Sequence, residues 1–180
     1  NYLNSSSITT YISPFLEYTR NVNLQPSINE EVSANFQYKR SSFWLAKYFE
    51  VDVVGISLPE RQIAGCKKRA NSMTLKGTTN FVQADYCHTP FAAESFDVIW
   101  ACESVCHAEN KVDFYKEAFR LLKPGGRIVL AEYLRTKRPL PGKDEILLKE
   151  KWLNNWAIED IDTEEEHFNQ MKSVGFKSIE

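Results

Sequence analysis

The chain has 180 residues, 43% of them hydrophobic and 26% charged, which predicts one globular domain with a core of its own. A formal net charge of −2 offers no basic excess for a phosphate backbone, so we expect a small molecule rather than nucleic acid as partner. No apolar stretch approaches the length of a membrane span, and we expect a cytoplasmic protein; homo-oligomer formation is left open.

Four cysteines are spread over a chain that is large enough to fold without disulfides, and no two of them have the spacing of a zinc knuckle. We therefore expect buried, reduced thiols at Cys66, Cys87, Cys102 and Cys106. Cys102, Cys106 and His107 could supply three metal ligands, but no fourth is in view. We predict no metal site.

The first forty residues predict an N-terminal helical extension or lid. A capping box, Ser27 with Glu30, precedes apolar residues at a spacing of four. Upstream of Ser41 no apolar run predicts a strand. We therefore divide the chain into an extension at residues 1–40 and a main domain at residues 41–180.

Strand and helix patterns alternate in the main domain. Short β-branched or apolar runs predict the strands, and a spacing of 3.6 between apolar residues predicts the helices. The predicted strands are residues 51–56, 81–84, 96–101 and 127–133, and the predicted helices are residues 41–49, 57–70, 115–122 and 163–174. Ser57 with Glu60 and Thr163 with Glu166 form capping boxes at two helix starts.

This alternation favours a doubly wound α/β fold with a mostly parallel sheet that is covered on both faces. Ligands of such folds bind beyond the carboxyl ends of the strands. The residues that follow those ends are Ser57, Asp85, Cys102, Glu103 and Tyr133.

Four segments resemble the successive motifs of one enzyme family. They are Val54-Gly55-Ile56-Ser57-Leu58 with Gln62, Gln83-Ala84-Asp85, Phe96-Asp97-Val98-Ile99-Trp100, and Arg120-Leu121-Leu122-Lys123-Pro124-Gly125-Gly126. Their order and spacing are similar to those of class I S-adenosylmethionine-dependent methyltransferases, over about Ser41 to Glu180. The resemblance implies the Rossmann-like fold of that family and S-adenosyl-L-methionine as cofactor.

The resemblance also implies where the cofactor binds. Most of the family has an acidic residue at Ser57; a hydroxyl there, with Gln62 five residues on, resembles the branch of tocopherol and cyclopropane-fatty-acid methyltransferases. Asp85 would accept from the adenine amine, with Tyr86 beside it; the alternative for Asp85 is an Asx turn. The other residues implied to line the cofactor site are Leu58, Ala84, Ala101 and Cys102.

The segment Ala101-Cys102-Glu103-Ser104-Val105-Cys106-His107-Ala108 looks like the corresponding segment of sterol C-methyltransferases. Methylation of an alkene creates a carbocation, which a carboxylate or an aromatic face stabilises and a base deprotonates. The resemblance therefore implies catalytic roles for Glu103 and His107. Alternatively, Glu103 is a structural carboxylate, and His107 caps the next helix or packs against the cofactor.

Other conspicuous side chains lie outside these motifs. His88 and His167 are expected to be solvated surface residues. Trp152 and Trp156 lie four apart on one predicted helix face. They belong either to the core or to the wall of a substrate pocket.

The expected glycine-rich turn is not found in the sequence. Methyltransferases of this class hold the methionine part of the cofactor with such a turn after the first strand. The first of the seven glycines is Gly55. We hypothesise that a strand and a loop are absent from the chain between about Asn35 and Ser41.

Together these patterns predict methyl transfer from S-adenosylmethionine to a small, apolar acceptor. C-methylation of a prenyl or terpenoid substrate is favoured, and O- or N-methylation is left open. The alternative is an inactive methyltransferase-like protein that serves as a binding or regulatory subunit. A nicotinamide dehydrogenase is disfavoured, because Ser57 stands where its acidic ribose residue would be.

Overall fold

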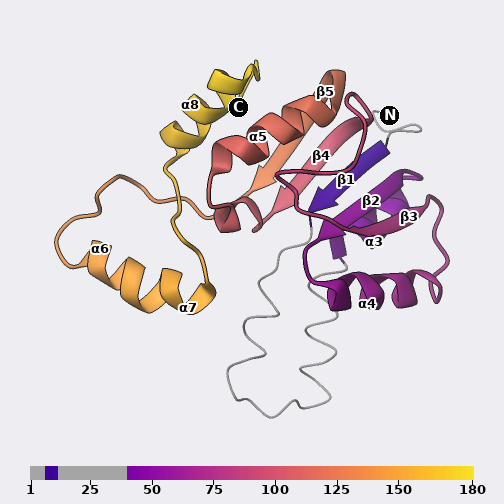
Figure 1. The fold of residues 1–180 in the computed structure, drawn as a ribbon, viewed down its shortest axis with the longest axis horizontal. Helices are drawn as coiled ribbons and strands as arrows, with labels where there is room; N and C mark the ends of the chain where they lie inside the picture. The colour runs from indigo at the N-terminus through magenta and orange to yellow at the C-terminus, as the bar shows by residue number, and fades with distance from the viewer. Residues whose placement is uncertain (1–6, 12–39) are drawn as a thin grey trace, which may run out of the picture.

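The computed structural model describes residues 7–11 and 40–180, which form one sheet with helices on both faces (Figure 1). All strand pairs are parallel, in the order β3–β2–β1–β4–β5. The strands are β1 (Ser7–Tyr11), β2 (Asp52–Ser57), β3 (Thr79–Gln83), β4 (Phe96–Cys102) and β5 (Leu122–Ala131). The predicted doubly wound α/β fold is confirmed.

The central strand comes from a segment that the sequence pattern assigned to a helix. Ser7–Tyr11 pairs with β2 on one side and with β4 on the other. The helical prediction is wrong for these residues, because Ser-Ile-Thr-Thr-Tyr is rich in β-branched side chains, which favour strands. No first strand needs to be missing between Asn35 and Ser41, since β1 fills that place, whereas the absence of a loop there stays a prediction. The rest of the predicted extension, residues 12–39, lies outside the described residues.

Alternate residues of a strand point to opposite faces, so both faces of this sheet can be buried. The long helices are α3 (Arg40–Tyr48), α4 (Glu60–Ala70), α5 (Lys111–Leu121) and α8 (Glu164–Val174). Val53 packs beside α3 and Phe81 beside α3 and α4, whereas Ile56 and Ile99 pack on the opposite face, which α5 and α8 cover. Within residues 7–11 and 40–180, no helix is long and apolar enough to cross a membrane.

The two predicted capping boxes have different outcomes. Thr163 accepts from the Glu166 N–H at 3.1 Å and the Glu166 carboxylate accepts from the Thr163 N–H at 2.8 Å, so this box is confirmed. The other prediction is wrong. Helix α4 has Pro59 as its N-cap with no side-chain cap bond, and the Ser57 hydroxyl bonds Gln62 instead.

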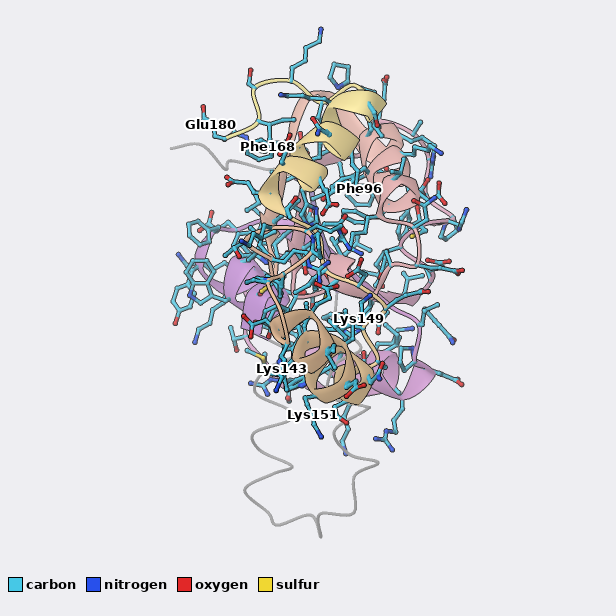
Figure 2. The ribbon with its side chains drawn as sticks, turned by 90° about the vertical axis from the view of Figure 1, so that its left-hand side faces the viewer. Phe96, Lys143, Lys149, Lys151, Phe168 and Glu180 are labelled. Atoms are coloured by element: carbon cyan, nitrogen blue, oxygen red, sulfur yellow. The ribbon has the colours of Figure 1, made fainter. Side chains whose placement is uncertain are left out.

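Residues 134–163, here called the arm, leave the sheet after β5 and return to α8. Their short helices are α6 (Asp144–Leu147), the π-helical η2 (Leu148–Leu153) and α7 (Asn154–Trp156). The arm lies on the side toward which the strands point (Figure 1). Figure 2 shows it from that side, with Lys143, Lys149 and Lys151 labelled. The arm can therefore contribute to a site at the strand ends.

Candidate active site

The carboxyl ends of β2 and β3 bring several predicted cofactor-binding residues together. The Ser57 hydroxyl, in a residue only 3% exposed, donates to Oε1 of Gln62 at 2.5 Å. The Ala84 N–H donates to the Ser57 carbonyl at 3.2 Å, and Nε2 of Gln83 donates to the Leu58 carbonyl at 2.8 Å. These bonds join the two strand ends to the first turn of α4.

One donor in this group is left unused. Nε2 of Gln62 is buried and has no hydrogen-bond partner in the described part of the chain. An unsatisfied buried donor costs roughly 1–3 kcal/mol, so it marks a place where a ligand oxygen or nitrogen can bind. The residues present therefore fit the ribose of the cofactor that the sequence resemblance implies.

Asp85 and Tyr86, both predicted to bind adenosine, have partners within the protein. Oδ1 of Asp85 accepts from the Cys87 N–H at 2.8 Å, and Oδ2 lies 3.5 Å from Nδ1 of the exposed His88. Asp85 thus forms the Asx turn that was its alternative interpretation. Tyr86 is buried, which raises its pKa, and it donates to the Ser104 carbonyl at 3.1 Å. Tyr86 therefore connects the segment after β3 to the loop after β4.

Glu103 follows β4 directly and has a left-handed backbone conformation, with φ +49°. This conformation costs a non-glycine residue roughly 1–2 kcal/mol and persists only where its surroundings hold it. The Glu103 N–H donates to the Ala131 carbonyl at 2.7 Å. Its carboxylate accepts a hydrogen bond from Tyr133, and burial together with this bond raises the Tyr133 pKa to about 12.

An aromatic group extends from Glu103 into the arm. The Tyr133 and Trp152 rings meet edge to face with centroids 4.9 Å apart, and Trp152 lies 6.1 Å from Trp156. Trp152 belongs to the π-helical η2, and π-helical turns are often found at functional sites. Both tryptophans are half-buried against a small apolar cluster that includes Leu153. Their packing against this cluster supports the core interpretation, and a role as the wall of a substrate pocket stays a prediction.

Glu132 organises the loop after β4, and the sequence analysis did not identify it. Its Oε1 accepts from the N–H groups of Ser104 and Val105 at 2.7 Å each, and its Oε2 accepts from the Cys106 N–H at 3.3 Å. Burial raises the Glu132 pKa, although these N–H bonds favour the carboxylate. The predicted strand 127–133 included this residue. Because β5 ends at Ala131, Glu132 in fact stands at a strand end, the position that should have drawn attention to it.

His107 is directed to the arm. Its Nδ1 lies 3.3 Å from the Ala157 carbonyl. A carbonyl only accepts, so Nδ1 carries the proton and Nε2 is left as the basic nitrogen. Burial lowers the His107 pKa, which favours the neutral ring. Glu103 and His107 thus share a loop but are held by different contacts, one with Tyr133 and one with Ala157.

His167 is not the surface residue that we predicted. It is 5% exposed, and its Nδ1 lies 2.5 Å from the Tyr115 hydroxyl, a bond that joins α8 to α5. Helices α5 and α8 pack against each other at this point. The periodicity of one helix shows which of its faces is buried but not which helix packs on that face. His167 belongs to the core of the α5–α8 layer.

All four cysteines are free thiols, as predicted; Cys66 and Cys106 are buried, whereas Cys87 and Cys102, also expected to be buried, are only partly so. Among the residues that the structure describes, no group of three or more His, Cys, Asp and Glu could hold a metal ion. Cys102 and Cys106 have pKa values raised chiefly by burial, so both are protonated at neutral pH. Neither thiol is activated as a nucleophile.

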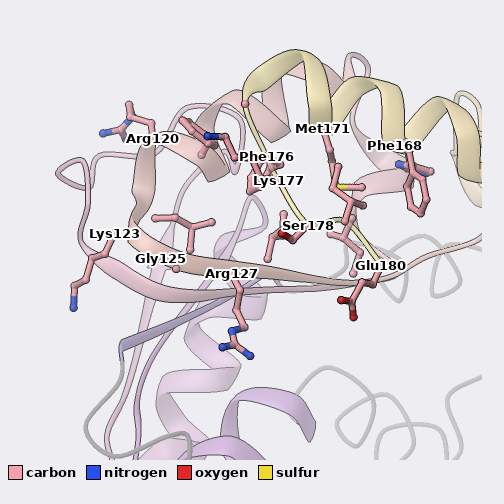
Figure 3. A pocket seen from close by; sticks show the side chains of 18 of the residues that line it. Arg120, Lys123, Gly125, Arg127, Phe168, Met171, Phe176, Lys177, Ser178 and Glu180 are labelled. Carbon is pink, nitrogen blue, oxygen red and sulfur yellow. The ribbon is translucent and has the colours of Figure 1, made fainter.

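A cavity of about 1360 Å³ lies away from the strand ends, along the outer edge of β5 (Figure 3). Its lining includes Arg127, Phe168 and Phe176. In the described part of the chain β5 has no strand on this side, so the cavity is the open edge of the sheet. It shares Glu132 with the loop after β4 and Leu134 with the start of the arm.

Comparisons with known proteins agree with this arrangement. The family described as "Methyltransferase domain" matches residues 38–130, just over half of the 180 residues. Cycloartenol-C-24-methyltransferase 1 of Oryza sativa subsp. japonica is 32% identical over 142 residues, covering 75% of this chain and 40% of that protein. Erythromycin 3''-O-methyltransferase of Saccharopolyspora erythraea is 31% identical over 102 residues, covering 57% of this chain and 33% of that protein.

A solved structure supports the fold. Phosphoethanolamine N-methyltransferase 2 of Haemonchus contortus, in complex with S-adenosyl-L-methionine, superposes with a TM-score of 0.71 at 16% identity and covers 100% of this chain and 35% of that chain. The chain spans less than half the length of each of these relatives. The family match confirms the resemblance inferred from four short motifs. The chain belongs to the methyltransferase domain family, the class I S-adenosylmethionine-dependent methyltransferases.

Proposed function

We propose that this chain is the catalytic domain of an enzyme that transfers a methyl group from S-adenosylmethionine to a small, apolar acceptor, with C-methylation of a prenyl or terpenoid chain favoured. The observation that carries the proposal is the hydrogen bond between Glu103 and Tyr133, with Trp152 packed on Tyr133. A carboxylate beside aromatic rings suits a reaction in which positive charge develops on an apolar substrate.

The adenosine end of the cofactor is assigned to the β2–β3 side. Ser57 and Gln62 bind the ribose, since Gln62 has an unused amide donor. Asp85 accepts from the adenine amine with the oxygen that its Asx turn does not use. The cofactor supplies an electrophilic methyl group on a sulfonium, and such a displacement needs chiefly positioning. Holding the adenosine is therefore the main task of these residues.

The acceptor is assigned to the β4–β5 side and the arm. The π electrons of an alkene would form the new carbon–carbon bond as the methyl–sulfur bond breaks and S-adenosylhomocysteine leaves, and a positive charge would remain on the neighbouring carbon. Glu103 stabilises this charge, while Tyr133 fixes the orientation of the carboxylate. Nε2 of His107 accepts the proton that the cation then loses, because Nδ1 is engaged with Ala157.

Oxygen and nitrogen acceptors are the competing substrate classes. The names of the three relatives cover C-, O- and N-methylation. A hydroxyl acceptor would need His107 as base but would develop little charge near Glu103. The aromatic group beside Glu103 favours the alkene.

The cytoplasmic location that composition suggests stays a prediction.

A screen of acceptors with methyl-labelled cofactor tests the proposal. Prenyl alkenes, phenols and amines of similar size are offered in parallel, and transferred label is counted. We expect label in the alkenes and little in the other two classes. Uptake by phenols or amines alone would contradict C-methylation, while methyl transfer itself would stand.

A second candidate is a methyltransferase-like binding or regulatory protein without activity. The observation that favours it is in the sequence, where no glycine precedes Gly55 to form the turn after the first strand. Calorimetry with S-adenosylhomocysteine separates the two candidates. An active domain binds this product, and an inactive relative that has lost the cofactor site does not.

A further inference from the structure

We infer that Glu132 is a positioning residue that fixes the loop carrying Glu103 and His107, and this inference rests on the proposed function. One carboxylate accepts three consecutive backbone N–H groups, those of Ser104, Val105 and Cys106. These residues occupy the interval between the two candidate catalytic side chains. Glu132 therefore acts on both without being catalytic itself.

The backbone of the loop requires such a constraint. Glu103 has φ +49°, a conformation that a residue with a side chain keeps only where several contacts impose it. Its N–H donates to the Ala131 carbonyl, and the next three N–H groups bond Glu132. Four successive N–H groups after β4 are thus bound by two adjacent residues at the end of β5.

The carboxylate of Glu132 has no capacity to spare for a substrate. Besides the three N–H groups, the Cys106 thiol donates to it. Burial and the neighbouring Glu132 keep the pKa of that thiol above its usual range, so Cys106 stays a donor. Tyr86 holds the same loop from the other side by donating to the Ser104 carbonyl at 3.1 Å. The loop is fixed from β3, β4 and β5 together.

The test compares two carboxylates that both accept a backbone N–H, the half-buried Glu132 and the buried Glu117. Glu132→Gln places an amide group against N–H donors with little change in size. Glu117→Gln is the matched control, because Glu117 accepts from the Thr89 N–H at 2.8 Å and pairs with Arg120, within the α5 layer. Glu132→Asp keeps the charge on a shorter side chain. It serves as the second variant if Glu132→Gln does not fold.

For Glu132→Gln we expect kcat to fall about a hundredfold, the usual result of misplacing a reacting group by about 1 Å. The acceptor KM and the Kd for S-adenosylhomocysteine should change less than about twofold. Glu132→Asp should recover part of kcat. Glu117→Gln should lower the unfolding temperature and leave kcat within about twofold of the parent.

Amide hydrogen exchange provides a readout that does not depend on activity. The amides of Ser104, Val105 and Cys106 should exchange faster in Glu132→Gln and keep their rates in Glu117→Gln. Unchanged exchange at these amides, or faster exchange with kcat intact, would overturn the inference. If the parent chain transfers no methyl group, the proposed function fails. The exchange rates at Ser104, Val105 and Cys106 would then still decide whether Glu132 fixes the loop.

Discussion

The two halves of the candidate site are built from contacts of different range. At the ends of β2 and β3, the side chains assigned to the cofactor bond residues two or five positions away, Asp85 with Cys87 and Ser57 with Gln62, although Gln83 and Ala84 also bond across the two strands. At the ends of β4 and β5, the bonds from Ser104, Val105 and Cys106 to Glu132 join residues 26 to 28 positions apart. The local bonds of the first half can form before the strands pair, whereas the Glu132 bonds of the second half exist only after β4 and β5 have paired.

The halves also differ in what they leave unpaired. The β2–β3 half keeps the buried amide of Gln62 without a partner among the described residues, so it is incomplete until a ligand binds. In the β4–β5 half, the Glu132 carboxylate accepts three N–H groups and Glu103 is bonded by Tyr133. We interpret the first half as a binding surface and the second as a preorganised reaction surface. Substitutions can separate these two roles.

The largest effect is expected from Glu103→Gln. The amide keeps the shape and can still accept from Tyr133, but it no longer stabilises positive charge, while His107 remains as the base. We expect kcat to fall about a hundredfold or more, and the Kd for S-adenosylhomocysteine to stay within about twofold. Steady-state kinetics on the best acceptor and calorimetry measure the two quantities.

The matched control for this change is Glu109→Gln, an exposed carboxylate six positions further along the chain. It should leave both quantities unaltered. Full activity in Glu103→Gln would show that Glu103 is structural. An equal loss of cofactor affinity and kcat would show that the two halves are not functionally separate.

The same contrast explains what the sequence could predict. The parallel α/β fold and the Asx turn of Asp85, its alternative interpretation, follow from short-range patterns, and both are present. Glu132 was not predicted, because its role depends on N–H groups that only the paired strands bring to it. His167 was assigned to the surface because no pattern within α8 indicates Tyr115 as its partner.

The central strand β1 was not predicted from the sequence for a related reason. Ser7–Tyr11 is a run of only five residues, which is too short to show a clear period. Its place in the sheet is determined by β2 and β4 on either side, and neither is near it in sequence. The β-branched side chains of this segment favour a strand, but only pairing with β2 and β4 makes it the centre of the sheet.

The next largest effect is expected on the pH dependence of the free energy of unfolding, which should depend on His107 in the β4–β5 half and not on His88 in the β2–β3 half. The pKa of His107 is lowered by burial from 6.5, so the unfolded chain binds more protons just below that pH. Stability is therefore lost as pH falls from about 6.5 toward the folded-state pKa, at no more than about 1.4 kcal/mol per pH unit for this group. His167 is shifted in the same direction by burial and adds to the loss.

Urea unfolding at pH 7.5 and pH 5.5 measures this effect. His107→Gln should reduce the difference between the two pH values, because the titrating group is gone. His88→Gln is the control from the β2–β3 half, where the imidazole is exposed, and it should leave the difference as in the parent. A parent chain equally stable at both pH values would contradict the prediction.

Asp85→Asn tests the acceptor role of Asp85 in the β2–β3 half. The asparagine oxygen can still accept from the Cys87 N–H, so the turn and the unfolding temperature should be kept. The amide that replaces Oδ2 cannot accept from the adenine amine. We expect the Kd for S-adenosylhomocysteine to rise about fivefold with kcat at saturation unaltered, as calorimetry and kinetics would show. An unchanged Kd would restrict Asp85 to the turn.

The smallest effect is expected from Gln62→Ala. The substitution removes the unused amide donor and should raise the Kd for S-adenosylhomocysteine about threefold, since one neutral hydrogen bond is lost. It also frees the protein of an unsatisfied buried donor, so the unfolding temperature should fall little although the Ser57 bond is lost. Gln83→Ala is the control, because its amide already donates to the Leu58 carbonyl and is not assigned to the ligand. Equal affinity in Gln62→Ala and the parent would mean that the β2–β3 half binds through its backbone alone.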